Sequence, residues 1–219
     1  KLFGIDLLKN FNYPYFSRDI AEFWRRWHIS LSSWFRDYLY IPLGGSKGSK
    51  LFQVRNTFII FLVSGFWHGA NWTFIAWGLI NAIYFLPLLL SNQNRKNLDN
   101  FTLGFNFSSV RIILNIVTTF CLTTLAWIFF RSKTIHEAIA YIQRMFSNFS
   151  FKEEYLAIER YNHNLITLLL IFIVVEWFSR TKVEPISGKY SWLKMSLCLA
   201  AILALGVFSD YKEFIYFQF

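Results

Sequence analysis

Long stretches without charged side chains are the feature of this sequence that most restricts its fold. From Asn56 to Asn94 the chain has 39 residues and no Asp, Glu, Lys or Arg. A second run of 19 uncharged residues covers 112–130, and two runs of 15 cover 161–175 and 195–209. A helix that crosses a bilayer needs roughly 20 mostly apolar residues. The pattern predicts about five transmembrane helices, with the first two inside 56–94.

Composition supports a membrane protein and argues against a nucleic-acid partner. Charged residues make up 16% of the chain, against about 25% in a typical globular domain. The net charge of +9 could attract nucleic acid, but the Lys and Arg residues lie mostly between the apolar runs. If every run crosses the membrane, 16 of the 22 Lys and Arg residues collect on one side. We expect that side to be cytoplasmic and the C-terminus to be extracytoplasmic.

Two other segments carry apolar residues at helical spacing. The first begins at Ser17, a predicted N-cap, and ends before Pro42. The second covers 134–147 and opens with the capping-box sequence TIHE. Both have the amphipathic pattern of helices that lie at a membrane interface. The predicted fold is therefore all-α and polytopic, with about five transmembrane helices plus amphipathic interfacial helices.

His68 is the one common ionisable side chain in the window 56–94. It lies thirteen residues after Arg55, which is about 20 Å along a helix and therefore deep in a bilayer. Gly65 and Gly69 are four apart, a spacing that lets another helix approach closely. The residues 69–71 can then break the helix. Irregular backbone at that depth requires neighbouring protein or a water-filled cavity, so we expect a cavity at His68.

Ionisable groups inside membranes are costly and tend to mark function. Burial favours the neutral imidazole of His68, which can accept a proton as a general base. The residues alone leave catalysis and a structural role equally open for His68, and they leave His28 open between an interfacial residue that faces water and a site residue. No cluster of His, Cys, Asp and Glu has the spacing of metal ligands, so we expect no bound metal or cofactor.

Two stretches, FWRRWHISLSSWFRDYLYIPLGG and SGFWHGANWTFIAWGLINA, resemble the membrane-bound O-acyltransferase superfamily, most closely its bacterial alginate O-acetyltransferase-like branch. They hold two histidines 40 residues apart, each preceded by Trp. The terminal EFIYFQF is similar to the end of that branch. Family members are about twice this length. The resemblance implies that 1–219 is the C-terminal part of a single domain whose N-terminal helices are absent.

The resemblance also implies roles for both histidines. His68 matches the catalytic histidine of the W-H-G motif, and His28 matches the second histidine of this branch. The family moves an acyl group from a cytoplasmic thioester to a hydroxyl. The implied reaction is transfer of acetyl from acetyl-CoA across the inner membrane of a bacterium towards an extracytoplasmic polysaccharide such as alginate. Implied partners are membrane lipids and a separate periplasmic acetyltransferase.

Six further residues are candidates for binding substrate. Arginine suits phosphate recognition, so Arg25, Arg26 and Arg36 could hold the phosphates of the donor, or alternatively extend to lipid headgroups. Asp37 and Asn71 could orient the histidines, and Trp67 could contact substrate. Two other functions remain open at this point. One is a proton-coupled transporter with a histidine relay, and the other is a non-catalytic membrane scaffold of a polysaccharide export complex.

Overall fold

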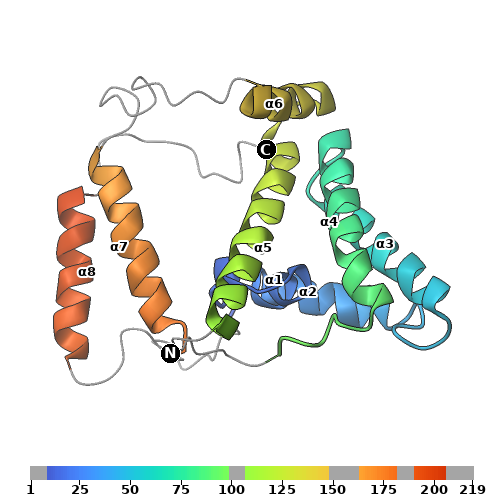
Figure 1. Ribbon diagram of the computed structural model, residues 1–219, viewed down its shortest axis with the longest axis horizontal. Coiled ribbons are helices and arrows are strands. Elements are labelled where there is room, and N and C mark those ends of the chain that lie inside the picture. The colour runs from blue at the N-terminus through green and yellow to red at the C-terminus, as the bar shows by residue number, and fades with distance from the viewer. Residues whose placement is uncertain (1–8, 99–106, 148–162, 182–189, 206–219) are drawn as a thin grey trace. The chain divides into compact units, whose positions relative to one another are not determined.

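The computed structural model describes residues 9–98, 107–147, 163–181 and 190–205 (Figure 1). All the regular elements among these residues are α-, 3₁₀- or π-helices, which agrees with the all-α class that the sequence predicts. The chain divides into two units, Lys1–Ile166 and Thr167–Phe219, and each is described by itself.

The predicted interfacial helix is divided into short elements. After a 3₁₀ turn, η1 (Pro14–Phe16), the chain forms α1 (Ile20–Arg26), α2 (Ile29–Phe35) and a π-helical turn, η2 (Arg36–Tyr40). The prediction of one continuous helix is therefore wrong. The break lies at Trp27, which is extended with ψ 127°, and at His28, which is left-handed with φ 47° and ψ 54°.

Hydrogen bonds from residues 10–12 explain this break. The carbonyl of Arg26 accepts from the backbone N–H of Asn12 at 2.9 Å, and the N–H of Ile29 donates to the carbonyl of Asn10 at 2.8 Å. A continuous helix would have used both groups within its own ladder. The segment before α1 therefore replaces two helical hydrogen bonds with long-range ones.

The start of α1 also differs from the prediction. Asp19 is the N-cap, and its carboxylate accepts from the backbone N–H of Glu22 at 2.7 Å. Ser17 is buried, and its hydroxyl donates to the carbonyl of Pro14 at 2.6 Å. The predicted N-cap was therefore two residues too early, because Ser17 closes the preceding 3₁₀ turn instead.

The helices α3 (Lys50–Trp67) and α4 (Trp72–Leu90) form a tightly packed pair joined by four residues (Figure 1). A Cβ added at Gly65 would lie 2.3 Å from the carbonyl oxygen of Phe74, and one added at Gly78 would lie 2.3 Å from that of Phe61. Gly65 thus allows close helix approach, as predicted. Its counterpart is Gly78 on α4. Gly69 lies beyond the end of α3.

Two more helices complete the first unit. The helix α5 (Phe107–Arg131) packs against α4, and α6 (Ile135–Ser147) crosses near the end of α5 (Figure 1). The backbone N–H of Glu137 donates to the hydroxyl of Thr134 at 3.1 Å, and the Glu137 carboxylate accepts from the N–H of Lys133 at 3.1 Å. These bonds confirm the predicted helix over 134–147 and the capping role of Thr134.

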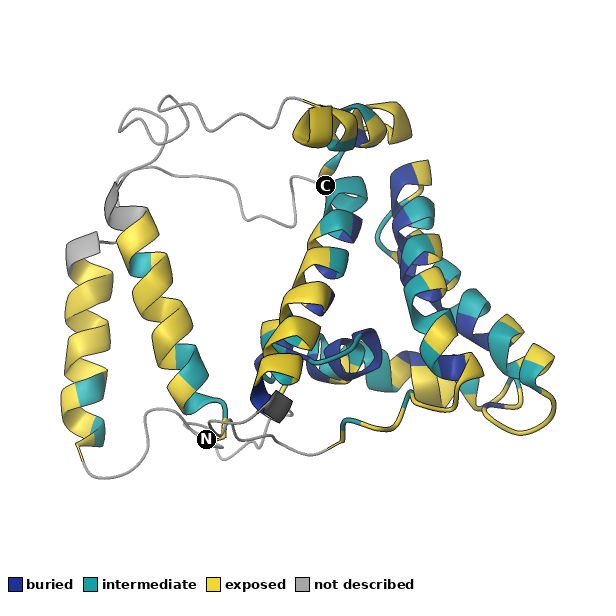
Figure 2. Ribbon diagram, viewed as in Figure 1, coloured by how far each residue is buried: buried dark blue, intermediate teal, exposed yellow. Residues whose placement is uncertain are grey.

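Two of the helices are long and apolar enough to cross a membrane. They are Trp72–Leu90, which is α4, and Ser109–Arg131 within α5, and much of the α5 surface is exposed (Figure 2). Most of α7 (His163–Ser179) and all of α8 (Ser191–Leu205) belong to the second unit, and both helices contain shorter apolar stretches. Each of the five predicted crossings therefore contains a helix among the described residues, and their number as complete crossings stays a prediction.

The first turns of α3 explain why this helix, unlike α4 and α5, is not among the candidate membrane spans. Lys50, Gln53 and Arg55 lie in its first two turns, and they lower the mean hydropathy of a helix whose second half is apolar. The predicted window for the first crossing begins only at Asn56, near the middle of α3. Asn56 is buried, and its side-chain amide donates to the carbonyls of Leu43 and Gly45 at 3.1 Å each.

Candidate active site

The turn that joins α3 to α4 carries His68. Its backbone N–H donates to the carbonyl of Gly65 at 3.1 Å, so the residue ends α3 as its C-cap. Gly69 follows with φ 146°, a conformation that disfavours L side chains, and a Cβ there would lie 2.9 Å from the Phe74 ring. The predicted helix break at 69–71 is confirmed.

Asn71 fixes the other end of this turn. Its side-chain oxygen accepts from the backbone N–H of Thr73 at 3.1 Å, which makes it the N-cap of α4. Its side-chain nitrogen donates to the carbonyl of Lys133 at 3.1 Å, at the junction between α5 and α6. Asn71 therefore connects the backbone around His68 to a segment more than sixty residues away, and its predicted orienting role would act through that backbone.

Aromatic rings surround the half-buried imidazole of His68. The ring centroids lie between 4.9 and 6.2 Å from the imidazole centroid and belong to Phe130, Trp67, Trp77 and Phe74. In the described part of the chain, neither imidazole nitrogen of His68 has a hydrogen-bond partner. Both nitrogens are therefore left for a ligand, and the surrounding surface is apolar.

The position of His68 affects its protonation. It lies in the interhelical turn, outside the two candidate spans Trp72–Leu90 and Ser109–Arg131, so its predicted position deep in a bilayer is not confirmed. Burial lowers its pKa below the ordinary value of 6.5, and the charge on His28 lowers the pKa further. The neutral imidazole, which can accept a proton, is therefore the dominant form near neutral pH.

His28 occupies the break between α1 and α2. It is half-buried, and its Nδ1 lies 3.5 Å from the hydroxyl oxygen of Ser30. The side-chain oxygen of Asn10 accepts from the N–H of Ser30 at 3.1 Å and from the Ser30 hydroxyl at 2.9 Å. Asn10 thus holds the chain in the left-handed bend that presents His28. A continuous helix, as the sequence predicted, would have placed this side chain differently.

A continuous series of ring contacts joins the two histidines. From His28 it passes through Phe11, Trp27, Trp127 and Trp77 to His68, with successive centroids 5.0–5.9 Å apart. These rings come from the segment before α1, from the α1–α2 break, and from α4 and α5. The sequence analysis missed Trp77, Trp127 and Phe130 because nothing in their local pattern separates them from other aromatic residues in apolar helices.

Arg26, one of the candidate substrate-binding arginines, pairs with a buried carboxylate and not with the His68 turn. Arg26 is buried, and its Nη2 donates to Glu22 Oε1 at 2.7 Å. Arg18 donates to the same carboxylate through its backbone N–H at 2.7 Å and through its guanidinium at 3.0 Å. Glu22 is itself only 1% exposed. The Glu22 carboxylate therefore anchors two guanidinium groups.

The other predicted substrate-binding residues lie at separate places. Arg25 donates to the carbonyls of Asn94 at 2.7 Å and Asn97 at 3.0 Å. Arg36 and Asp37 form an exposed ion pair with an N–O distance of 2.7 Å, and the hydrogen bonds from Arg36 lower the pKa of the Asp37 carboxyl. Trp67 is exposed beside His68. The structure therefore gathers Trp67 and Asn71 at the His68 turn, whereas the hydrogen bonds of the arginines lie elsewhere.

The predicted cavity at His68 stays a prediction. The cavity that the structure contains between α1 and the end of α4 is lined by other residues. Among the described residues, no group of three His, Cys, Asp or Glu side chains is arranged to hold a metal ion. The arrangement at His68 is thus a neutral proton acceptor among aromatic rings. Such a group can take the proton from a hydroxyl as its oxygen attacks a carbonyl carbon. The carbonyl must already be activated by another group.

Comparisons with known proteins indicate a family for this chain. Residues 2–99, which include both histidines, match the membrane-bound O-acyltransferase family. Over 99% of its length the chain is 34% identical to a peptidoglycan O-acetyltransferase from Helicobacter pylori, and it covers 44% of that protein. Over its whole length it is 32% identical to a probable alginate O-acetylase from Pseudomonas putida, and it covers 47% of that protein.

A third similarity concerns a different acyl group. Over 37% of its length the chain is 45% identical to a teichoic acid D-alanyltransferase from Streptococcus thermophilus, and it covers 21% of that protein. The chain spans less than half the length of each of these relatives.

Proposed function

Because the chain belongs to the membrane-bound O-acyltransferase family, we propose that it carries the catalytic histidine of a membrane O-acetyltransferase. The observation that supports this most directly is the His68 imidazole. It is half-buried among four aromatic rings and has no hydrogen-bond partner among the described residues. A structural histidine would normally use its ring nitrogens in hydrogen bonds.

The proposed reaction needs one proton acceptor. The thioester donor is already activated, and the acceptor is a hydroxyl group. His68 takes the hydroxyl proton as the oxygen attacks the thioester carbonyl carbon, which forms a C–O bond. The tetrahedral intermediate then loses the thiolate as the C–S bond breaks, and the imidazolium returns its proton to that sulfur. The apolar rings around His68 keep water away from the donor, which would otherwise be hydrolysed.

His28 is proposed as a second site residue that positions donor or acceptor. It is linked to His68 by the ring series described above, and its charge affects the pKa of His68. Its left-handed backbone is fixed by Asn10, so the imidazole is presented by a conformation that non-glycine residues rarely adopt. Such backbone strain is common at functional sites.

We further propose acetyl-CoA as donor and a polysaccharide hydroxyl on the extracytoplasmic side as acceptor. The names of two relatives, a peptidoglycan O-acetyltransferase and a probable alginate O-acetylase, support an acetyl group and a glycan. They differ in the glycan, so the proposal stops at an extracytoplasmic polysaccharide. The bacterial inner membrane, an extracytoplasmic C-terminus and a periplasmic acetyltransferase partner are parts of the same proposal.

The test uses the full-length protein in cells from which the gene has been deleted. O-acetyl esters are measured in envelope and secreted glycans after complementation with wild type, His68→Ala or His136→Ala, at matched membrane abundance. His136 is an exposed histidine on α6 and serves as the matched control. We expect His68→Ala to give the ester content of the deletion strain and His136→Ala to give that of wild type.

Unchanged esters in the His68→Ala strain, in a glycan whose acetylation depends on the gene, would contradict the proposed catalytic role. Loss of esters that is accompanied by loss of the protein from its complex would instead support a membrane scaffold. Gene-dependent proton flux without gene-dependent esters would support a transporter.

A further inference from the structure

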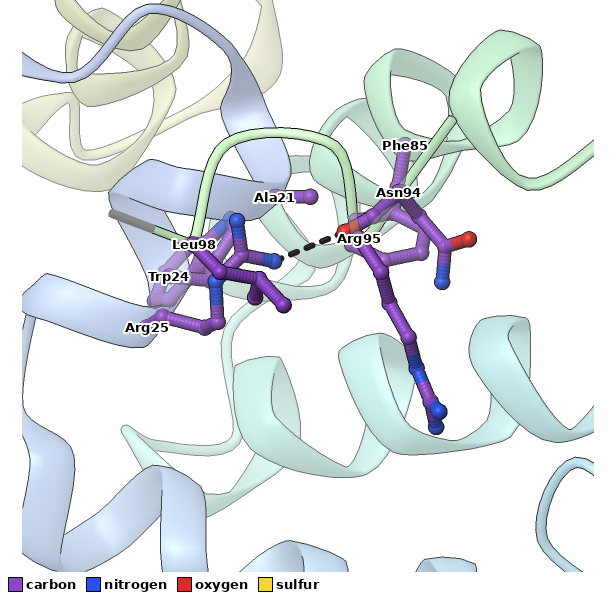
Figure 3. A pocket seen from close by; sticks show the side chains of 7 residues that line it. All are labelled: Ala21, Trp24, Arg25, Phe85, Asn94, Arg95 and Leu98. Carbon is purple, nitrogen blue, oxygen red and sulfur yellow. Dashed lines mark hydrogen bonds between the residues drawn. The ribbon is translucent and has the colours of Figure 1, made fainter. Parts of the chain in front are cut away.

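A cavity of about 430 Å³ lies between α1, the C-terminal part of α4 and the segment that follows α4 (Figure 3). It is separate from the His68 turn. Seven residues line it: Ala21, Trp24, Arg25, Phe85, Asn94, Arg95 and Leu98. Figure 3 shows Trp24, Arg25 and Leu98 on one side, and Phe85, Asn94 and Arg95 on the other.

The lining combines apolar surface with two cations. Trp24, Phe85 and Leu98 supply most of the apolar part, and no acidic residue belongs to the lining. Arg25 is held in place by its bonds to the carbonyls of Asn94 and Asn97, which use two of its five N–H groups. Three N–H groups of this positioned guanidinium therefore remain for an anion.

Arg95 supplies the second charge. It is exposed, and it has no ion pair or hydrogen bond with the residues that the structure describes. Figure 3 shows the Arg95 side chain extending away from Arg25, so the two guanidinium groups offer separate positive charges along the lining of the cavity. Each can bind acceptor oxygens, such as those of a phosphate, through paired hydrogen bonds.

The position of the cavity relative to the candidate span indicates the rest of the ligand. Phe85 lies in the last two turns of α4, which ends at Leu90, and Arg95 lies five residues beyond that end. The apolar side thus adjoins the span and the cations lie past it. A phospholipid has the same order, with acyl chains in the hydrocarbon layer and a phosphate at its edge.

We propose that this cavity binds the phosphate and the adjoining acyl chain of an anionic phospholipid. The inference rests on the membrane location of the chain and does not depend on acetyl transfer. A soluble phosphate ester has the same phosphate group but needs no apolar wall at the end of a span, and the test distinguishes the two sources.

The experiment uses purified full-length protein in detergent and measures retention of phosphatidylglycerol or phosphatidylcholine by native mass spectrometry. The key variant is Arg95→Gln. The matched control is Lys96→Gln, which removes the neighbouring exposed cation from outside the cavity. A second variant, Leu98→Trp, fills the cavity and leaves every charge in place.

We expect wild type and Lys96→Gln to retain phosphatidylglycerol in preference to phosphatidylcholine. Loss of one charge-assisted hydrogen bond should weaken retention by Arg95→Gln about tenfold. Leu98→Trp should also lose the bound lipid. Circular dichroism and thermal unfolding establish that each variant is folded.

Three results would overturn the proposal. Equal loss in Arg95→Gln and Lys96→Gln would show diffuse charge attraction. Retention of both lipids alike would show that the phosphate-binding cations are not selective. Displacement of phosphatidylglycerol by coenzyme A, with dependence on Arg95, would assign the cavity to a soluble phosphate ester. None of these results requires acetyl transfer, so failure here is distinct from failure of the proposed catalytic role.

Discussion

The indole of Trp77 stands perpendicular to the imidazole of His68, with an interplanar angle of 90° and centroids 5.4 Å apart. Trp77 is 2% exposed and also contacts Trp24 and Trp127. A single side chain of α4 thus forms part of the wall around His68 and joins α4 to α1 and α5. The stability of the fold and the shape of the candidate site depend on the same ring.

Replacement of Trp77 should therefore affect stability strongly. Truncating a buried Trp to Ala typically costs about 3–5 kcal/mol. We expect Trp77→Ala to lower the unfolding temperature of the full-length protein in detergent markedly, as followed by intrinsic fluorescence. Trp72→Ala is the control, because Trp72 is 75% exposed one and a half turns away. A similar fall in unfolding temperature in both variants would mean that the buried packing of Trp77 does not stabilise the fold.

Glu22 provides a second prediction, since its buried carboxylate forms ion pairs with two guanidinium groups. In Glu22→Gln the buried Arg26 loses its counter-charge, and removal of one partner from a buried pair costs about 3–5 kcal/mol. We expect a large fall in the unfolding temperature. The control is Asp37→Asn, which removes the carboxylate from an exposed pair and should change little. Equal effects would contradict the importance of burial.

A third prediction concerns the contact between α3 and α4. In Gly78→Ala the new methyl group would lie 2.3 Å from the Phe61 carbonyl oxygen, which is backbone and cannot rotate away. The helices must then separate, at a cost of about 1–3 kcal/mol. The unfolding temperature in detergent measures this. Ile83→Val changes one methyl group at an exposed position of the same helix and should leave the temperature unchanged. An unaffected Gly78→Ala protein would show that α3 and α4 are not in close contact.

Local sequence signals predicted much of this architecture. The apolar run from Trp72 to Leu90 coincides with α4, and the capping box at Thr134 begins α6. Both depend on interactions within a few residues, namely hydropathy, helical spacing and side-chain capping. The glycine spacing likewise indicated close helix contact at Gly65, although the partner Gly78 belongs to the following helix.

The break at His28 could not be predicted in the same way. The apolar spacing continues through Trp27, so a local analysis extends the helix. The helix is interrupted because Asn10 and Asn12 form hydrogen bonds with backbone groups on either side of the break, and such pairing is visible only in three dimensions. The approach of Trp127 to Trp27 is also long-range. The sequence therefore offers both histidines as candidates, and that choice stays a prediction, while their relation through aromatic rings required the fold.

The last prediction concerns the pH dependence of the proposed reaction. Burial and the charge on His28 lower the pKa of His68, so the proton-accepting form persists as pH falls through 6.5. The acid limb of kcat/KM, measured on purified full-length enzyme with acetyl-CoA and a soluble acceptor, should lie below that value. His28→Gln removes one cause of the lowering, so the acid limb of its residual activity should move upward. An acid limb at or above 6.5 in wild type, or a downward shift in His28→Gln, would contradict the role of neutral His68 as base.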